Sequence, residues 1–225
     1  MLYVFVVSLI LIMVGELADK SQLLALCLAT RYKAWQVLLG ITAATFVVHF
    51  FSAAFGQLVG GLIPQGVMPW ISGLLFIFFG LWTLRGDTVE DEDAAVGRGA
   101  RFGPVLAVAV AFFFAELGDK TQIMTITIAA DPGGALLSVL KSAGPAVSGA
   151  LASLGIVPGA TVAPAARFWG VTLGSTLGMV LADAVAIGVG RMLGKRLPEQ
   201  LLTRISGIAF ILFGVLTIAA PYLFG

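Results

Sequence analysis

Long apolar runs, separated by short polar segments, dominate this chain of 225 residues. The runs cover residues 2–30, 35–63, 67–84, 104–130, 166–193 and 203–224. A helix needs about 20 mostly apolar residues to cross a bilayer, and every run except the third reaches that length. Prolines mark turns near the run ends, at Pro64, Pro69, Pro104 and Pro198. The pattern predicts an all-α integral membrane protein with six transmembrane helices.

The second half of the chain repeats the first. Residues 16–22 read ELADKSQ, and residues 116–122, at an offset of 100 residues, read ELGDKTQ. Residues 35–84 match residues 169–218 at a constant offset of 134 residues. The two offsets differ by 34 residues, which indicates an insertion at residues 131–165.

Each half therefore carries three predicted helices. Because three is an odd number, the second half enters the membrane from the opposite side, which gives the inverted repeat common in secondary transporters. We expect residues 1–84 to form the first repeat and residues 104–225 the second. Residues 85–103 form an acidic loop between them, and residues 131–165 are an insert within the second repeat.

Lysine and arginine residues are unevenly divided between the two sides of the predicted bundle. The first, third and fifth loops hold nine of them, whereas the other side holds only Lys141 and Arg167. Since cytoplasmic loops are enriched in Lys and Arg, we expect residues 85–103 in the cytoplasm. Both termini and the insert are then expected outside the cytoplasm, with the protein in a bacterial inner membrane.

Composition agrees with a membrane location. Hydrophobic residues make up 59% of the chain and charged residues 11%, against about a quarter charged residues in a soluble domain. A net charge of +1 gives no indication of a nucleic-acid partner, and the single cysteine, Cys27, cannot form an internal disulfide. The first run lacks a basic leader and contains Glu16 and Asp19, so we expect a retained helix and not a signal peptide.

Acidic residues inside the apolar runs are the main candidates for chemistry. Five of the 12 acidic residues lie there: Glu16, Asp19, Glu116, Asp119 and Asp183. Each charged group costs at least about 2.5–3.5 kcal/mol to insert at the bilayer centre, so the chain must recover that cost by pairing or by binding ions. If each run is one continuous helix, the two motifs each present a Glu, an Asp and a Gln within an arc of about 120°.

The expected ion ligands are Glu16, Asp19, Gln22, Glu116, Asp119 and Gln122. All offer hard oxygen donors, which suit Ca²⁺, Mn²⁺ or Mg²⁺. Ser21 and Thr121 are expected to add a polar lining. The alternative is a structural role, in which the acidic and lysine residues of the two motifs form interhelical salt bridges that hold the bundle together.

Two further pairs stand at equivalent places in the repeat. Lys20 and Lys120 follow the motif glutamates by four residues, the favourable helical spacing for an ion pair, and are expected to pair with them or to act in gating. His49 and Asp183 also correspond, and either could carry protons or support the site. A buried histidine that simply donates one hydrogen bond is the alternative for His49.

The doubled motif resembles that of the calcium/manganese cation–proton antiporter family, which has one E-x-G-D-[KR]-[ST] sequence in each half. Its members include Golgi and thylakoid proteins and bacterial manganese exporters. Residues 116–121 fit fully, whereas Ala18 stands where the family has glycine. The resemblance covers the chain except residues 131–165. It implies a divalent-cation site of Glu16, Asp19, Glu116 and Asp119, and exchange of Mn²⁺ or Ca²⁺ for protons.

We therefore predict a secondary transporter, not an enzyme, that exports Mn²⁺ and/or Ca²⁺ from the cytoplasm in exchange for protons by alternating access. Its partners are divalent cations, protons and the lipid bilayer, with no tightly bound cofactor, and a homo-oligomer is compatible with the sequence. One alternative is an intramembrane aspartyl protease, although a protease needs two carboxylates sharing a proton. The other is an exporter of an organic solute.

Overall fold

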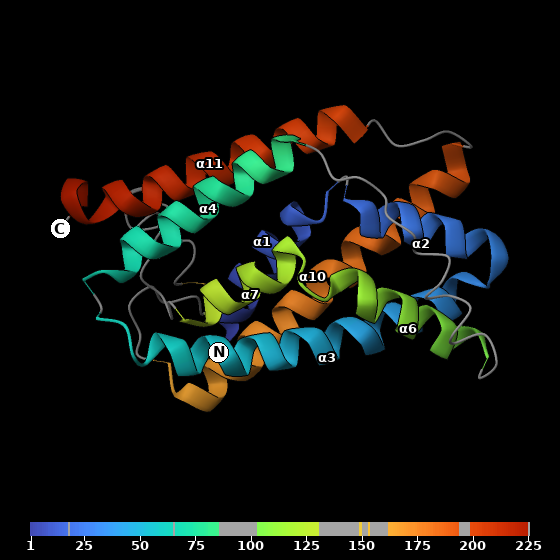
Figure 1. The fold of residues 1–225 in the computed structure, drawn as a ribbon, viewed down its shortest axis with the longest axis horizontal. Helices are drawn as coiled ribbons and strands as arrows, with labels where there is room; N and C mark the ends of the chain where they lie inside the picture. Colours follow the sequence, from blue (N-terminus) through green and yellow to red (C-terminus); the bar gives the residue numbers. More distant parts are fainter. Residues whose placement is uncertain are drawn as a thin grey trace.

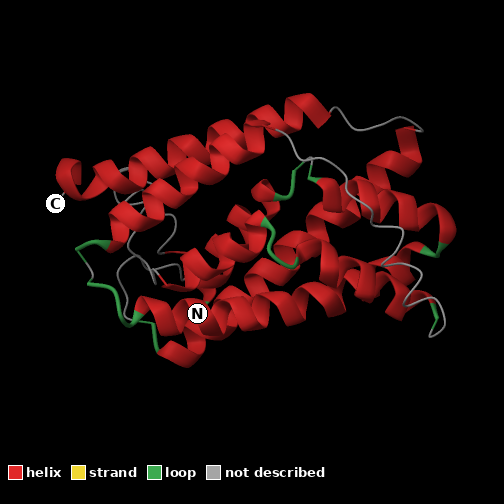
Figure 2. Cartoon of the chain, viewed as in Figure 1, coloured by secondary structure: helices red, strands yellow, loops and turns green. Residues whose placement is uncertain are grey.

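A computed structural model describes residues 1–17, 19–64, 66–85, 103–130, 149, 153, 162–193 and 199–224. Within these ranges the regular structure is helical (Figures 1 and 2). The main helices are α1 (Leu2–Gly15), α2 (Lys20–Arg31), α3 (Ala34–Gly60), α4 (Met68–Arg85), α6 (Pro104–Glu116), α7 (Lys120–Ala130), α10 (Pro164–Leu193) and α11 (Glu199–Phe224). Nearly all of the predicted acidic loop and most of the predicted insert lie outside the described residues.

Four of the six predicted spans are continuous helices. The runs at residues 35–63, 67–84, 166–193 and 203–224 correspond to α3, α4, α10 and α11. By length and composition, α3, α4 and the Pro164–Gly190 part of α10 could each cross a membrane. The predicted all-helical class is therefore confirmed for the described part of the chain.

The other two runs are broken helices, so the prediction of continuous helices was wrong for them. The first run divides into α1 and α2, and the fourth into α6 and α7, with both breaks inside the repeated motif. At the second break Gly118 has a φ of +86°, a left-handed conformation that ends a helix. At the first, Asp19 is the extended N-cap of α2, a position where aspartate is preferred.

Each broken pair has the length of one span. The 14 residues of α1 extend about 21 Å at 1.5 Å per residue, short of the hydrocarbon core of about 30 Å. The 12 residues of α2 supply the missing length. The 13 residues of α6 and the 11 of α7 combine in the same way.

The helix contacts have the symmetry of the sequence repeat. Helix α1 packs on α10 and α6 packs on α3, while α2 packs on α10 and α7 on α3. The remaining large contacts join counterparts, α3 with α10 and α4 with α11. Exchanging the two halves therefore leaves this set of contacts unchanged. In Figure 1, α4 and α11 run side by side along one edge, with α1 and α7 between them and α3.

Small polar side chains lie inside the bundle, and many large apolar ones lie on its outer surface. Ser8, Thr45, Thr125, Thr172 and Ser175 are fully buried. In contrast, Phe51, Leu58, Leu81, Ile208 and Leu212 are more than half exposed on the surfaces of long helices. An apolar core that includes Phe79 and Phe112 is buried as well, and the apolar outer surface suits helices whose outer faces contact lipid.

Four glycines set the closest approach of α4 and α11. A Cβ on Gly73 would lie 2.7 Å from the carbonyl oxygen of Gly214, and a Cβ on Gly80 would lie 2.6 Å from that of Gly207. The repeat relates the two pairs to each other, because Gly73 corresponds to Gly207 and Gly80 to Gly214. Because no side chain fits at these crossing points, the helices pack backbone against backbone, as small residues permit in membranes.

The variant Gly80→Ala should therefore be destabilised, because its new methyl group forces the two helices apart. We expect a loss of about 1–3 kcal/mol, typical of overpacking, measured as a lower apparent unfolding temperature in detergent. The control is Gly188→Ala in α10, where a Cβ meets nothing within 4 Å. Equal unfolding temperatures for the two variants would contradict the packing described for Gly80.

Candidate functional site

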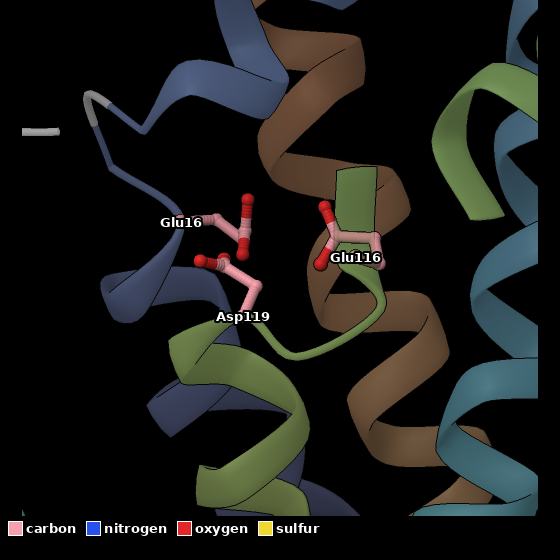
Figure 3. A group of neighbouring side chains, drawn as sticks. All are labelled: Glu16, Glu116 and Asp119. Carbon is pink, nitrogen blue, oxygen red and sulfur yellow. The ribbon is translucent and has the colours of Figure 1, made fainter. Parts of the chain in front are cut away.

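The two helix breaks bring three carboxylates together in the interior. Glu16 is the C-cap that follows α1, Glu116 is the last residue of α6, and Asp119 immediately precedes α7. One oxygen from each lies within 4.8 Å of the others, and all three side chains are buried. Figure 3 shows them pointing toward one another. We call these three residues the carboxylate cluster. It combines both halves of the chain, so neither half could form it alone.

Each motif binds its own glutamate across its own break. The hydroxyl of Ser21 donates a hydrogen bond of 2.5 Å to Oε2 of Glu16, and that of Thr121 donates one of 2.9 Å to Oε2 of Glu116. The other oxygen of each glutamate, Oε1, is buried and accepts no hydrogen bond within the described residues. Buried acceptors without donors are costly, so these two oxygens are suited to binding a cation.

The fourth motif carboxylate, Asp19, lies beside the cluster in an ion pair. Nζ of Lys120 lies 2.8 Å from Oδ1 of Asp19, and both side chains are almost fully buried. This ion pair joins Lys120 to the other half of the chain, and the pairing of Lys120 with Glu116 of its own motif stays a prediction. The break between residues 116 and 120 removes the helical register on which that prediction depended. The side chain of Lys20 and the whole of Ala18 lie outside the described residues.

The two motif glutamines are placed differently. Oε1 of Gln122 accepts a hydrogen bond of 2.6 Å from the backbone N–H of Gly118, so this oxygen supports the break. Gln22 is buried, on the first turn of α2. The predicted arc of Glu, Asp and Gln on one helical face does not exist in either motif, because the helix stops between the Glu and the Gln.

Asp183 and His49 differ in their relation to these acids. Asp183 is completely buried in α10, and neither of its oxygens has a hydrogen-bond partner in the described residues. Its carboxylate interacts electrostatically with those of Asp19, Glu16 and Glu116. Asp183 therefore belongs to the same polar interior as the cluster.

His49 instead contacts Thr176, with 3.3 Å between Nδ1 and the threonine hydroxyl. That hydroxyl donates its own proton to the carbonyl of Thr172. A hydroxyl has a single proton to donate, so Nδ1 of His49 must be the donor in this contact. The geometry matches the alternative of a buried histidine that donates one hydrogen bond.

One supporting residue was missed at the level of sequence. Ser206, in α11, donates a hydrogen bond of 3.4 Å to the backbone carbonyl of Leu17, inside the first break. A carbonyl freed by a helix break needs such a partner. The available signal was the Ile-Ser-Gly triplet at residues 205–207, which matches residues 71–73. The triplet supported the repeat but indicated no role for its serine.

A family model for the divalent cation/proton antiporter GDT1 matches residues 4–91 and 159–223, more than half of the chain. The chain belongs to the GDT1 family. The first motif lies within the matched residues, and the second lies between the two matched segments. The resemblance inferred from the paired motifs is confirmed.

Curated relatives of this GDT1 family member extend over nearly its whole length. A Vibrio cholerae protein named "Putative manganese exporter" is 28% identical over 215 residues, covering 95% of this chain and 90% of its own. The GDT1-like protein sll0615 of Synechocystis is 28% identical over 235 residues, covering 96% and 97%. GDT1-like protein 5 of Arabidopsis thaliana is 26% identical, covering 96% of each chain. No solved structure matches significantly.

Membership in an antiporter family makes this chain a membrane transport protein and not an enzyme. The alternative of an intramembrane aspartyl protease is therefore discarded. The exporter of an organic solute is discarded too, because the family exchanges divalent cations and protons.

The break at Gly118 yields a prediction. A φ of +86° is strained for any residue with a Cβ, although a Cβ here would have free space around it. We expect Gly118→Ala to lose about 1–2 kcal/mol of stability and to bind Mn²⁺ more weakly, because Glu116 and Asp119 flank the break. Thermal unfolding in detergent measures the loss of stability, and calorimetric titration of the purified protein with Mn²⁺ measures the change in binding.

A matched control is Gly103→Ala, which has a similar φ of +97° at the start of α6 and equally free space. It should lose comparable stability and keep its Mn²⁺ affinity. Gly118→Asn should lie between wild type and Gly118→Ala, since asparagine tolerates this conformation better. Unchanged affinity in Gly118→Ala would mean that the break does not position the carboxylates.

Proposed function

We propose that this GDT1 family member is a secondary transporter that exports Mn²⁺ and/or Ca²⁺ from the cytoplasm in exchange for protons. The observation that carries the proposal is the carboxylate cluster, in which both halves contribute buried acidic oxygens that are not saturated by hydrogen bonds. Carboxylate oxygens are the preferred ligands of Ca²⁺ and also suit Mn²⁺. The name of the Vibrio cholerae relative favours Mn²⁺ as a substrate.

In this proposal Glu16, Glu116 and Asp119 supply the first ligands of the transported ion. We assign Asp19 and Gln22, which are buried and belong to the same motif as Glu16, to complete the coordination from the first half. Ser21 and Thr121 orient the glutamates through their hydrogen bonds. Oε1 of Gln122 serves the backbone in this structure, so we give Gln122 a supporting role at the second break.

Protons exchange for the ion because they compete for the same oxygens. Several carboxylates confined in a dry interior cannot all remain ionised without a cation. When the divalent ion leaves, protons replace its charge, and when an ion binds, they are displaced. Asp183 is our candidate for an additional proton carrier, because it is buried without a hydrogen-bond donor and interacts with three of these acids.

The proposed architecture has six spans in two inverted repeats. The α1–α2 and α6–α7 pairs each count as one span, together with α3, α4, α10 and α11. The first repeat occupies residues 1–84 and the second residues 104–225. The exchange symmetry of the helix contacts supports this arrangement. Alternating access then results from movement of one half against the other around a site that both halves share.

The proposed orientation in a bacterial inner membrane places residues 85–103 in the cytoplasm and both termini outside it. It rests on the excess of Lys and Arg in the first, third and fifth loops. Single cysteines at positions 93 and 150, in a Cys27→Ser background, test it. A membrane-impermeant thiol reagent applied to intact cells should label position 150 only. Labelling of position 93 would reverse the orientation.

The transport proposal is tested with purified protein in liposomes, by measuring Mn²⁺ and Ca²⁺ flux and proton movement under an imposed pH gradient. We expect divalent-ion entry to be coupled to proton exit. Glu16→Gln and Glu116→Gln should each lower the apparent affinity by at least roughly tenfold, because each removes a charge that the ion contacts. The repeat predicts similar losses for both.

Asp183→Asn provides a second result in the same assay. If Asp183 carries protons, this variant should keep divalent-ion binding and move fewer protons per ion. Its matched control is His49→Asn at the equivalent repeat position, which should leave the proton-to-ion ratio unchanged. Full proton-coupled flux in both glutamine variants would refute the carboxylate site, and an unchanged ratio in Asp183→Asn would remove Asp183 from the mechanism.

A further inference from the structure

The ion pair of Asp19 with Lys120 joins the two halves of the chain at the carboxylate cluster. Asp19 is the N-cap of α2 in the first half, and Lys120 is the first residue of α7 in the second. The atoms Oδ1 and Nζ are 2.8 Å apart, and both side chains are excluded from solvent. The contact therefore connects the two segments that an alternating-access movement would have to shift.

Lys120 faces more of the site than its direct partner. Besides the pair with Asp19, its ammonium group interacts electrostatically with Glu16 and Asp119. Asp19 in turn interacts with Glu16 and Glu116. A positive charge that is fixed to the chain thus lies among the acids that are proposed to bind the divalent ion.

Breaking such a pair in a dry interior is costly unless another cation takes over the aspartate. Removing one partner of a buried ion pair leaves an uncompensated charge, which is strongly destabilising. A divalent ion that binds at the cluster can replace Lys120 as the positively charged partner of the Asp19 carboxylate. Binding of the ion and release of Lys120 would then be one event.

We propose that Lys120 is a tethered competitor of the transported ion, and that its pair with Asp19 holds the two halves together until the ion replaces it. Asp19 then changes partners, from the lysine to the divalent ion, and becomes the fourth carboxylate of the filled site. The carrier that holds neither the divalent ion nor the exchanged protons is kept from changing sides by this bridge, which prevents futile movement of an empty carrier. The proposal rests on the transport function proposed above, and Lys120 is a positioning residue in it.

The proposal predicts that removing the charge of Lys120 strengthens Mn²⁺ binding. A salt bridge with a purely structural role predicts no such gain. Lys120→Met keeps the length of the side chain and removes its charge, so the ion no longer has to displace a competitor. Mn²⁺ binding to the purified full chain, measured by calorimetric titration, should tighten by about tenfold or more. Exchange in liposomes should slow by a similar factor, because the ion leaves Asp19 more slowly. A purely structural bridge predicts unchanged or weaker binding, and either result would overturn the proposal.

Two controls separate this effect from general electrostatics and from misfolding. Arg85→Gln removes the same charge at the exposed end of α4 and should leave Mn²⁺ affinity within about twofold of wild type. A gain in affinity equal to that of Lys120→Met would mean that only the net charge of the protein matters.

Lys120→Arg keeps the charge and is expected to fold even if Lys120→Met does not. Because a guanidinium pairs with a carboxylate in bidentate fashion, it should weaken Mn²⁺ binding several-fold, and unchanged binding would count against the competitor.

A double-variant comparison completes the test. Asp19→Asn alone removes the aspartate charge that Lys120 pairs with and leaves the lysine charge beside the cluster, so this variant should weaken Mn²⁺ binding most. In Asp19→Asn combined with Lys120→Met, the second change should strengthen Mn²⁺ binding by more than Lys120→Met does alone, whereas independent effects would simply add. Absence of Mn²⁺ and Ca²⁺ binding in the wild type would instead refute the proposed function itself. If the wild type binds these ions and Lys120→Met shows no gain in Mn²⁺ affinity, only the role of Lys120 as a competitor is refuted.

Discussion

The cost of burying carboxylates in an apolar interior is the constraint on which this structure depends. Five acidic side chains lie in a bundle whose outer surface is apolar, and burial there requires each to find a hydrogen-bond donor, a cation or a proton. The chain supplies Ser21, Thr121 and Lys120 within the described residues. These partners leave oxygens of Glu16, Glu116 and Asp183 unsatisfied. That remaining demand for positive charge is what an antiporter can satisfy alternately with metal ions and protons.

Helix breaks are the means by which the fold gathers these groups. A continuous helix presents residues three or four apart along one face, so each repeat would offer its acids separately. Ending α1 at Gly15 and α6 at Glu116 turns both motifs into short connections inside the bundle. The glutamates then face one another across the repeat boundary (Figure 3). Freed backbone groups at the breaks are partly satisfied by Gln122 and Ser206, which ties the geometry of the site to helices α7 and α11.

Much of this could be predicted from the sequence, because hydropathy and the repeat carry the information directly. The positions of α3, α4, α10 and α11 follow from their apolar runs, and the motif acids stand out as charges in apolar surroundings. The helix breaks could not be predicted in the same way, since a run of apolar residues has the same hydropathy whether its helix is continuous or interrupted. Gly118 and the N-cap preference of Asp19 were the local signals. The partner of Lys120 depends on how two halves separated by 100 residues pack together, which no local pattern contains.

The central claim is that one divalent ion binds between the two halves, at Glu16, Glu116 and Asp119. The most direct test is a crystal structure of the protein with Mn²⁺, in which anomalous scattering identifies and locates the metal. The account predicts one peak between the two broken helices, with oxygens of all three carboxylates at about 2.0–2.6 Å. A peak elsewhere in the protein, or one coordinated by residues of a single repeat, would contradict it.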